Sequence, residues 1–257
     1  MTKEITFYKY QGTGNDFIIT TDLYEVTTDQ IVSLCDRKYG IGADGLILMR
    51  KGGTTDFDMM YYNADGSESF CGNGSRCAAK HAAYLGWVSS ECTFKSNDGE
   101  HTATIEDDEV KLKMHDVDMV LVEDEGYMLN TGSPHYIAYT EELEELDLIT
   151  AAHAIRYNDN FKEVGINVNY LEAKNGILYM RTYERGVEDE TLSCGTGATA
   201  AAIAHYLEKE STVKKFSQKI QTKGGALVVT FSKKDTVFSN IYLCGPAVQV
   251  YSGKISI

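Results

Sequence analysis

Cys71-Gly72-Asn73-Gly74 and Cys194-Gly195-Thr196-Gly197 are the stretches that decide the fold of this 257-residue chain. Each places a cysteine directly before glycines, and each is followed by small residues, Ala78-Ala79 and Ala82-Ala83 after the first and Ala198 to Ala204 after the second. A helix with small residues on nearly every face allows strands to approach from all sides. The two stretches therefore predict two buried, central helices that begin just after the cysteines.

The sequences on either side of these helices repeat in the same order. Residues 13–19 recur loosely at 131–137, Gly40-Ile41 at Gly165-Ile166, and Tyr62-Asn63 at Tyr183-Glu184. Together with the cysteine stretches, these matches keep a nearly constant offset of about 120 residues, which indicates two halves of similar fold. The boundary is expected near residues 115–125.

Each half is predicted to be rich in short strands. Segments with β-branched and aromatic residues indicate the strands, and caps with amphipathic spacing indicate helices at 28–38, begun by Thr27 or Thr28, and at 148–158. The strand candidates are 17–20, 46–49, 57–62, 110–114, 136–139, 177–183, 227–231 and 241–243.

Composition and charge limit the classes of function. The chain is 43% hydrophobic, which is enough for a sizeable core, and its formal net charge of −14 repels nucleic acid and anionic membranes. The first ten residues carry Lys3, Glu4 and Lys9 and do not resemble a signal peptide, and no apolar run is long enough to cross a membrane. We therefore expect a cytoplasmic protein whose six cysteines are reduced.

The two cysteines before the glycines are suited to acid–base chemistry. The free N–H groups and positive dipole at a helix N-terminus stabilise a thiolate and can also bind a carboxylate. If Cys71 and Cys194 face one cleft, one can remove a proton from a carbon next to a carboxylate and the other can return a proton to the opposite face. The helix N-termini would stabilise the negative charge that accumulates.

Other candidate sites carry weaker signals. Cys35, Cys92 and Cys244 are best explained as buried small residues. Cys77 and His81 lie four residues apart on one helix face, but no further paired ligands accompany them, so no metal site is predicted. Residues 40–45 match a dinucleotide-binding glycine pattern, yet a strand follows where that pattern requires a helix.

Taken together, the motifs resemble the diaminopimelate epimerase family from end to end. They are Gly12-Thr13-Gly14-Asn15-Asp16-Phe17, Asn63-Ala64-Asp65-Gly66-Ser67-Glu68, Cys71-Gly72-Asn73-Gly74-Ser75-Arg76-Cys77, Gly132-Ser133-Pro134-His135, Glu184-Arg185-Gly186, Cys194-Gly195-Thr196-Gly197-Ala198 and Gly245-Pro246-Ala247.

The resemblance implies a cofactor-independent isomerase that interconverts LL- and meso-diaminopimelate for lysine and peptidoglycan precursor biosynthesis. It implies an α+β fold of two pseudo-symmetric halves, each a mostly antiparallel sheet or barrel wrapped around a central helix. Residues 1–117 with a returning strand at 247–257 would form the first half, and residues 118–246 the second. The partners expected are a small-molecule substrate and, in a homodimer with Tyr251 near the contact, a second copy of the chain.

The resemblance also implies roles for individual residues. Cys71 and Cys194 match the acid–base pair, and His135 and Glu184 match positions that tune the catalytic site; Glu184 also matches a substrate ligand. Arg185 suits the distal carboxylate, because its guanidinium can bind both oxygens. The remaining expected substrate contacts are Asn15, Asn63, Gly72, Asn73, Asn167, Gly195 and Thr196.

The chain departs from the family pattern at three places. Many members have Gln where this chain has Gly45 and Asn where it has Ser133, and residues 187–190 form a longer and more acidic linker. Two other functions remain open. A proline-racemase-like enzyme shares the two thiols, although that family usually has His at the position of Asn73. A non-catalytic protein that binds amino acids or small anions is disfavoured by the presence of both cysteines.

Overall fold

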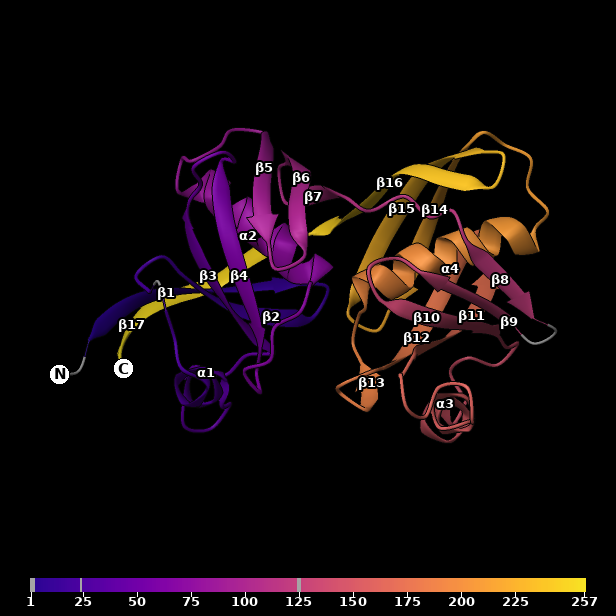
Figure 1. The fold of residues 1–257 in the computed structure, drawn as a ribbon, viewed down its shortest axis with the longest axis horizontal. Coiled ribbons are helices and arrows are strands. Elements are labelled where there is room, and N and C mark those ends of the chain that lie inside the picture. Colours follow the sequence, from indigo (N-terminus) through magenta and orange to yellow (C-terminus); the bar gives the residue numbers. More distant parts are fainter. Residues whose placement is uncertain (1–2, 24, 124–125) are drawn as a thin grey trace. The chain divides into compact units, whose positions relative to one another are not determined.

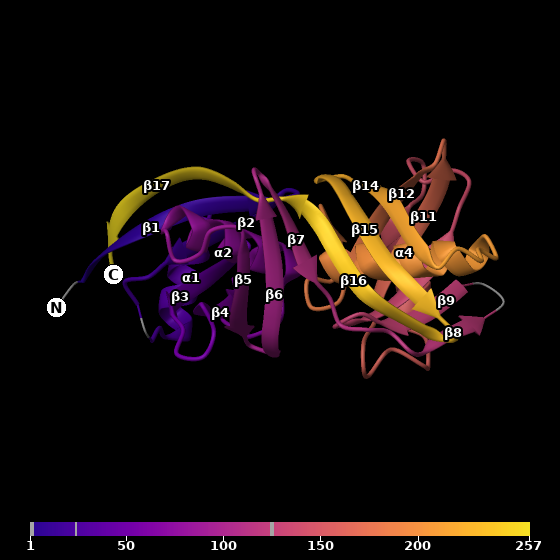
Figure 2. The same ribbon diagram turned by 90° about the horizontal axis from the view of Figure 1, so that it is seen from above.

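The computed structural model describes residues 3–23, 25–123 and 126–257. The chain divides into two compact units, one made of Met1–Leu112 with Gly245–Ile257 and the other of Lys113–Cys244. Each unit is a mixed sheet, mostly antiparallel, with a long helix packed against it (Figures 1 and 2). This architecture confirms the predicted α+β class.

The first unit contains helices α1 and α2 and a sheet in the spatial order β17-β1-β2-β3-β4-β5-β6-β7. The pairs β2–β3 and β4–β5 are parallel and the others antiparallel. Its elements are β1 (Glu4–Gly12), β2 (Asn15–Thr20), α1 (Thr28–Cys35), β3 (Gly45–Lys51), β4 (Phe57–Asn63), α2 (Gly72–Tyr84), β5 (Glu91–Ser96), β6 (Gly99–Glu106), β7 (Glu109–Lys113) and β17 (Val248–Ser256).

Helix α2 is the centre of this unit, as its small residues predict. It contacts β1, β2, β3, β4, β6 and β17, and its residues from Gly72 to Ala79 are all buried (Figure 1). The alanines at positions 78, 79, 82 and 83 let these strands approach on several sides, because they carry no bulk beyond Cβ. Polar side chains are buried here too, among them Arg76 and His81, both fully enclosed.

The second unit repeats this plan around helix α4. Its sheet runs β8-β9-β10-β11-β12-β14-β15-β16, and the short strand β13 pairs with β12. Its elements are β8 (Val120–Glu123), β9 (Gly126–Asn130), β10 (Pro134–Tyr139), α3 (Leu148–Arg156), β11 (Asn167–Lys174), β12 (Ile177–Glu184), β13 (Asp189–Thr191), α4 (Gly195–Glu208), β14 (Lys215–Thr222), β15 (Gly225–Lys234) and β16 (Val237–Pro246).

The order of parallel and antiparallel pairs is the same in the two units. The parallel pairs β2–β3 and β4–β5 correspond to β10–β11 and β12–β14. Along the chain, α1 and α3 each connect the two strands of the first parallel pair of their unit, and α2 and α4 each lie in the connection between the two strands of the second. The weak sequence repeat therefore reflects the same arrangement of strands and helices in both units.

Strand β17 completes the first unit from the far end of the chain. It runs antiparallel to β1 from Glu4↔Ser256 to Gln11↔Val248, with a bulge between Lys9 and Tyr10. Figures 1 and 2 both show this yellow strand beside the indigo β1. On the other side of β1, a two-residue turn leads into β2, with Thr13 and Gly14 at φ of 52° and 82°. Positive φ at both central residues suits a tight hairpin, which explains the glycine.

Two predicted helices are shorter than expected. Helix α1 ends at Cys35 rather than near residue 38, because the Asp36 carboxylate accepts hydrogen bonds from the backbone N–H groups of Lys38 and Tyr39 and forms a turn. Its start follows Thr27, which forms a capping box with Gln30. Helix α3 ends at Arg156 rather than 158. Within the described ranges, no helix has the length and apolar character of a membrane span.

Candidate active site

The expected site residues of the first unit lie at one end of its sheet. Asn15 begins β2, Gly45 begins β3, Asn63 ends β4 and Gly72 begins α2. Strands β2 and β3 run parallel to each other, and β4 runs antiparallel to β3. The first residues of β2 and β3 therefore lie beside the last residue of β4 at one end of the sheet, where Gly45 pairs with both Phe17 and Asn63. The topology alone therefore gathers residues distant in sequence around the N-terminus of α2.

The second unit assembles the equivalent edge. Ser133 precedes β10, Asn167 begins β11, Glu184 ends β12 and Gly195 begins α4. Asn167 pairs with His135 in the parallel ladder, and the next residue, Val168, pairs with Tyr183. Gly45 and Asn167 thus occupy corresponding positions, as do Asn63 and Glu184.

Cys71 is the N-cap residue of α2. Its backbone is extended, with φ of −131° and ψ of 109°, and its Sγ accepts a hydrogen bond from the N–H of Gly74 at 3.4 Å. The Sγ also donates to Oδ1 of Asn15, 3.7 Å away, and the same oxygen accepts from Nδ2 of Asn73 at 3.3 Å. The structure therefore brings Cys71, Asn15 and Asn73 together at a helix start with no acidic residue in its first turn.

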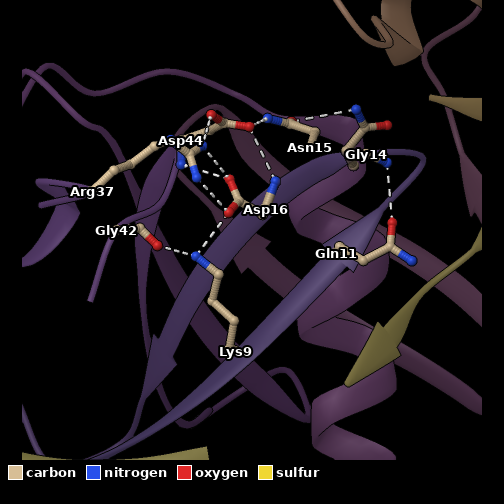
Figure 3. A network of polar contacts seen from close by, with 9 residues as sticks. Lys9, Gln11, Gly14, Asn15, Asp16, Arg37, Gly42 and Asp44 are labelled. Atoms are coloured by element: carbon tan, nitrogen blue, oxygen red, sulfur yellow. Dashed lines mark hydrogen bonds and ion pairs between the residues drawn. The ribbon is translucent and has the colours of Figure 1, made fainter. Parts of the chain in front are cut away.

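A network of charges holds Asn15 from the other side (Figure 3). Nδ2 of Asn15 donates to Oδ2 of Asp44 at 2.6 Å. Arg37 donates to Asp44 and to both oxygens of Asp16, and the buried Lys9 ammonium lies 2.8 Å from Asp16 and also donates to the carbonyl of Gly42. Burial alone would raise the pKa of Asp16, but hydrogen bonds from Arg37 and Lys9 hold it well below its usual range.

Cys194 occupies the same N-cap position on α4 but has different partners. Its backbone is again extended, with φ of −121° and ψ of 113°, and its side chain forms no cap hydrogen bond. Its Sγ lies 3.4 Å from Oγ1 of Thr196, and that oxygen lies 2.9 Å from Nε2 of His135. The structure thus groups Cys194, Thr196 and His135, and His135 reaches the sulfur through the threonine hydroxyl.

Asn169 and Thr182 extend this group and were missed by the sequence reasoning. Nδ2 of Asn169 donates to Nδ1 of His135 at 3.0 Å and to the carbonyl of Tyr136 at 3.2 Å, and the Thr182 hydroxyl donates to Oδ1 of Asn169 at 2.9 Å. Both residues are buried. The signal available was the spacing Asn167-x-Asn169, because residues two apart on a strand share one face.

Gly197, the second glycine after Cys194, is required because the Asn169 side chain lies close to its Cα. A Cβ at Gly197 would lie 2.6 Å from Oδ1 of Asn169 and 3.3 Å from Cε1 of His135. Any side chain here would displace the amide that holds His135. Burial lowers the pKa of His135 to about 3, with a further contribution from the positive charge of Arg185, so the imidazole is neutral at physiological pH.

The remaining expected ligands differ in how fully their side chains are engaged. Nδ2 of Asn63 donates to the loop at Ser67 and Ser69. Asn167 donates to Ser133 Oγ at 2.6 Å and accepts from the backbone N–H of Arg185 at 2.9 Å. The exposed Arg185 side chain donates one hydrogen bond to the carbonyl of Val164 at 3.3 Å, which leaves further guanidinium donors for a ligand.

The three departures from the family pattern have local explanations. A Cβ at Gly45 would lie 2.4 Å from the Tyr61 ring, so this ring fills the space of a side chain. Ser133 is held by Asn167. In the acidic linker, Glu188 accepts from Arg156 at 2.9 Å and Glu190 pairs with Arg181 at 2.7 Å, which neutralises part of its charge.

The other thiols lie in the core. Burial raises the pKa of Cys35 to about 11 and that of Cys77 and Cys92 to about 12. The His81 ring shares a hydrogen bond with the Tyr10 hydroxyl at 3.2 Å, and burial lowers its pKa to about 4. These thiols stay protonated at neutral pH and are poor nucleophiles.

Comparison with known proteins agrees with these features. The chain is 44% identical over 255 residues to a diaminopimelate epimerase of Flavobacterium psychrophilum, an alignment covering 96% of this chain and 99% of that protein. It is 38% identical over 260 residues to the diaminopimelate epimerase of Chlorobaculum tepidum, with 96% and 99% covered.

Solved structures with lower identity share the fold. A phenazine biosynthesis protein of the PhzF family from Bacillus anthracis matches with a TM-score of 0.73 at 12% identity, over 99% of this chain and 100% of that one. A hydroxyproline epimerase from Agrobacterium vitis, solved with trans-4-hydroxy-L-proline, matches with a TM-score of 0.71 at 13% identity, over 99% and 93%. The model of the family "Diaminopimelate epimerase" matches residues 7–120 and 127–250, so this chain belongs to that family.

Proposed function

We propose that this protein interconverts LL- and meso-diaminopimelate by moving a proton at one α-carbon, with Cys71 and Cys194 on opposite faces of that carbon. The observation that carries the proposal is the matched placement of the two cysteines. Each is the extended N-cap residue of a buried helix that has no acidic residue in its first turn. In the proposal, these two positions supply two sulfurs and two sets of backbone donors to one substrate.

The helix starts account for the difficult part of the chemistry. Removing an α-proton leaves negative charge on the adjacent carboxylate, and this charge is stabilised by N–H groups already oriented toward it. In the proposal these donors are the first-turn amides at Gly72, Asn73, Gly195 and Thr196. The protein needs them because its net charge of −14 opposes the build-up of further negative charge on the reacting carboxylate.

The other residues bind the rest of the substrate. Arg185 holds the distal carboxylate, because its exposed guanidinium has donors to spare. Asn15, Asn63, Asn167 and Glu184 supply acceptors for the ammonium groups, with amide donors beside them. His135 acts through the hydroxyl of Thr196 and Glu184 tunes the site from the end of β12, with no pyridoxal phosphate or metal required.

Proton exchange in heavy water tests the proposal. We expect LL-diaminopimelate to acquire deuterium at one α-carbon as it converts to the meso isomer, with no cofactor added. The variants Cys71→Ala and Cys194→Ala should each abolish epimerisation, whereas Cys92→Ala, which removes a buried core thiol, should retain it. Full exchange in the double variant Cys71→Ala/Cys194→Ala would exclude the two-thiol mechanism. Turnover of proline or hydroxyproline in place of diaminopimelate would select a proline-racemase-like enzyme, and binding without turnover a binding protein.

We also propose a homodimer in the cytoplasm. Val250 and Tyr251 on β17 are 57% and 45% exposed, and the Tyr251 ring contacts Phe7 edge-on, which gives a partly apolar strand surface suited to a second copy. The six cysteines are free thiols, which suits a reducing compartment. Light scattering should give the mass of a dimer for the native chain and of a monomer for Tyr251→Asp; a monomeric native chain would refute the dimer.

A further inference from the structure

The turn that carries Arg185 is closed by one residue, Glu188. Strand β12 ends at Glu184 and pairs with β13, so residues 185–188 form the turn of a hairpin. The backbone N–H of Glu188 donates to the carbonyl of Glu184 at 2.8 Å, and Oε1 of Glu188 accepts from the N–H of Gly186 at 3.2 Å. These two groups belong to the peptide bonds before and after Arg185. Glu188 therefore holds both peptide planes that set the direction of the Arg185 side chain.

The carboxylate of Glu188 is itself anchored to helix α3. Its Oε1 accepts from Nη2 of Arg156, the last residue of α3, at 2.9 Å. Its Oε2 accepts from the hydroxyls of Tyr157 at 3.1 Å and Tyr183 at 3.2 Å. Burial alone would raise the pKa of Glu188, but the hydrogen bond from Arg156, with those from Gly186 and Tyr157, holds it below its ordinary value. The carboxylate is therefore ionised at neutral pH and pairs with the Arg156 charge.

Arg156 also holds the loop against which the Arg185 side chain packs. Its Nη1 donates to the carbonyl of Phe161 at 3.1 Å, in the loop between α3 and β11. The Arg185 side chain reaches the same loop, where it donates to the carbonyl of Val164 at 3.3 Å. A Cβ at Gly165 would lie 2.5 Å from Cδ of Arg185 and 3.4 Å from Cζ of Arg156, so both side chains pack against this glycine. Arg156 therefore ties the hairpin turn to the loop that supports Arg185.

The backbone of Glu188 indicates that its side chain is kept for a purpose other than folding. Its φ is 57°, in the left-handed region that favours glycine. A glycine would form this turn with less strain, whereas the glutamate keeps the strain and places a carboxylate two residues from Gly186. Strain of this kind is typical of functional sites.

We propose that Glu188 is a positioning residue that sets where the Arg185 guanidinium meets the distal carboxylate of the substrate. The inference deepens the proposed function and rests on it for the identity of that carboxylate. A turn without the Glu188 side chain keeps its backbone bond to Glu184 but loses the bonds to Gly186 and Arg156. Arg185 then samples several directions, and a guanidinium must be aligned with a carboxylate to give both of its hydrogen bonds. Glu188 touches no substrate in this scheme, so its effect passes through Arg185.

Glu188→Gly tests this role, because it removes the side chain from a position whose φ suits glycine. We expect KM for LL-diaminopimelate to rise about tenfold and kcat to change less than about twofold, since the distal carboxylate is bound equally before and during proton transfer. The matched control is Glu210→Gly, an exposed residue with φ of 47° at the opposite end of α4 from Cys194, which should keep the native KM. Both variants should unfold within about 3 °C of the native protein. An unchanged KM in Glu188→Gly would overturn the proposal.

A double-mutant cycle separates positioning from a general structural effect. If Glu188 acts through Arg185, then Glu188→Gly should change KM by less than about twofold in an Arg185→Ala background. The same rise in KM in both backgrounds would show an effect that is independent of Arg185, and the proposal would fail.

Arginine modification measures the same contact without substrate. Phenylglyoxal reacts with exposed guanidinium groups, and its rate at Arg185 is followed by peptide mass spectrometry. We expect Glu188→Gly to raise this rate about threefold or more, as for the loss of one hydrogen bond, and Glu210→Gly to leave it unchanged. Equal rates in the native protein and Glu188→Gly would refute the positioning role. If the native protein does not epimerise diaminopimelate, the proposed function fails, and this rate alone decides whether Glu188 positions Arg185.

Discussion

Replacing Asp16 with asparagine should destabilise the first unit by about 3 kcal/mol. The Lys9 side chain is 7% exposed and the Asp16 side chain 19%, so the substitution leaves a buried ammonium that has lost the carboxylate charge paired with it and keeps neutral acceptors such as the Gly42 carbonyl. Removing one partner of a buried ion pair typically costs about 3–5 kcal/mol. The partial exposure of Asp16 places the expected value at the lower end. The lost bonds from Arg37 add little, because that side chain is 58% exposed.

Tryptophan fluorescence can measure this loss of stability specifically in the first structural unit. The one tryptophan of the chain, Trp87, lies in the first unit, so its emission during urea unfolding reports on that unit. With a denaturant slope of about 2–3 kcal/mol per molar, the midpoint should fall by about 1 M. Glu4→Gln is the matched control, since it breaks an ion pair with Lys254 whose side chains are 61% and 64% exposed, and it should move the midpoint by less than about 0.3 M.

A double-mutant cycle and a pH series test whether the charges of Lys9 and Asp16 stabilise each other. Lys9→Met combined with Asp16→Asn should cost about 2 kcal/mol less than the sum of the single changes, because no charge is then left alone. Additive costs would show that the pair is not coupled. The folded pKa of Asp16 is depressed, so the stability it contributes is present above the unfolded value near 4 and is lost as the pH falls further. The difference between native and Asp16→Asn should therefore be constant from pH 8 to 5 and shrink below pH 4.

Three further predictions follow from the second unit. Gly197→Ala should lower kcat by about tenfold or more, because its Cβ would lie 2.6 Å from the Asn169 amide oxygen, whereas Gly53→Ala, with no atom within 4 Å, should be neutral; equal activities would contradict this. Arg185→Ala should raise KM for diaminopimelate by about 10- to 100-fold, and an unchanged KM in steady-state assays would remove its assigned role. The depressed pKa of His135, about 3, means that the unfolded chain binds more protons below pH 6.5. Protonation of His135 in the unfolded chain should lower the free energy of unfolding by about 1 kcal/mol at pH 5.5 relative to pH 7.5. In urea titrations, His135→Gln should reduce this dependence of stability on pH.

The central helices and several strands could be predicted because their signals are local. Glycines after a cysteine and a run of alanines describe a buried helix start directly, and β-branched runs at 46–49 and 57–62 lie inside β3 and β4. Strands such as β5 and β6 were missed, although β5 alternates exposed and buried residues strictly. Its buried positions include Cys92 and Ser96, which carry little hydrophobic signal. β1 was missed as well, because its buried lysine, Lys9, is explained only by a partner in another strand.

The residues of the candidate site likewise fall into those that local sequence identifies and those that only tertiary contacts reveal. Residues within or next to the glycine motifs, such as Asn73 and Thr196, could be identified from sequence and resemblance. Asn169 and Asp44 could not be assigned a role, because each acts through a hydrogen bond to a residue more than 25 positions away. The tertiary fold decides which end of an amide faces a sulfur, and no local pattern in a sequence carries that information.

The pairing of β17 with β1 has a consequence for synthesis on the ribosome. The second unit, Lys113–Cys244, is continuous in sequence, but the first needs Gly245–Ile257, which are translated only after the whole second unit. At ordinary elongation rates, the edge of β1 that β17 will cover stays unpaired for on the order of ten seconds after residue 112 has been added. Such an edge is a template for pairing with another nascent chain. The second unit can thus complete its fold before the first, and β17 completes the first unit in one late, aggregation-sensitive step.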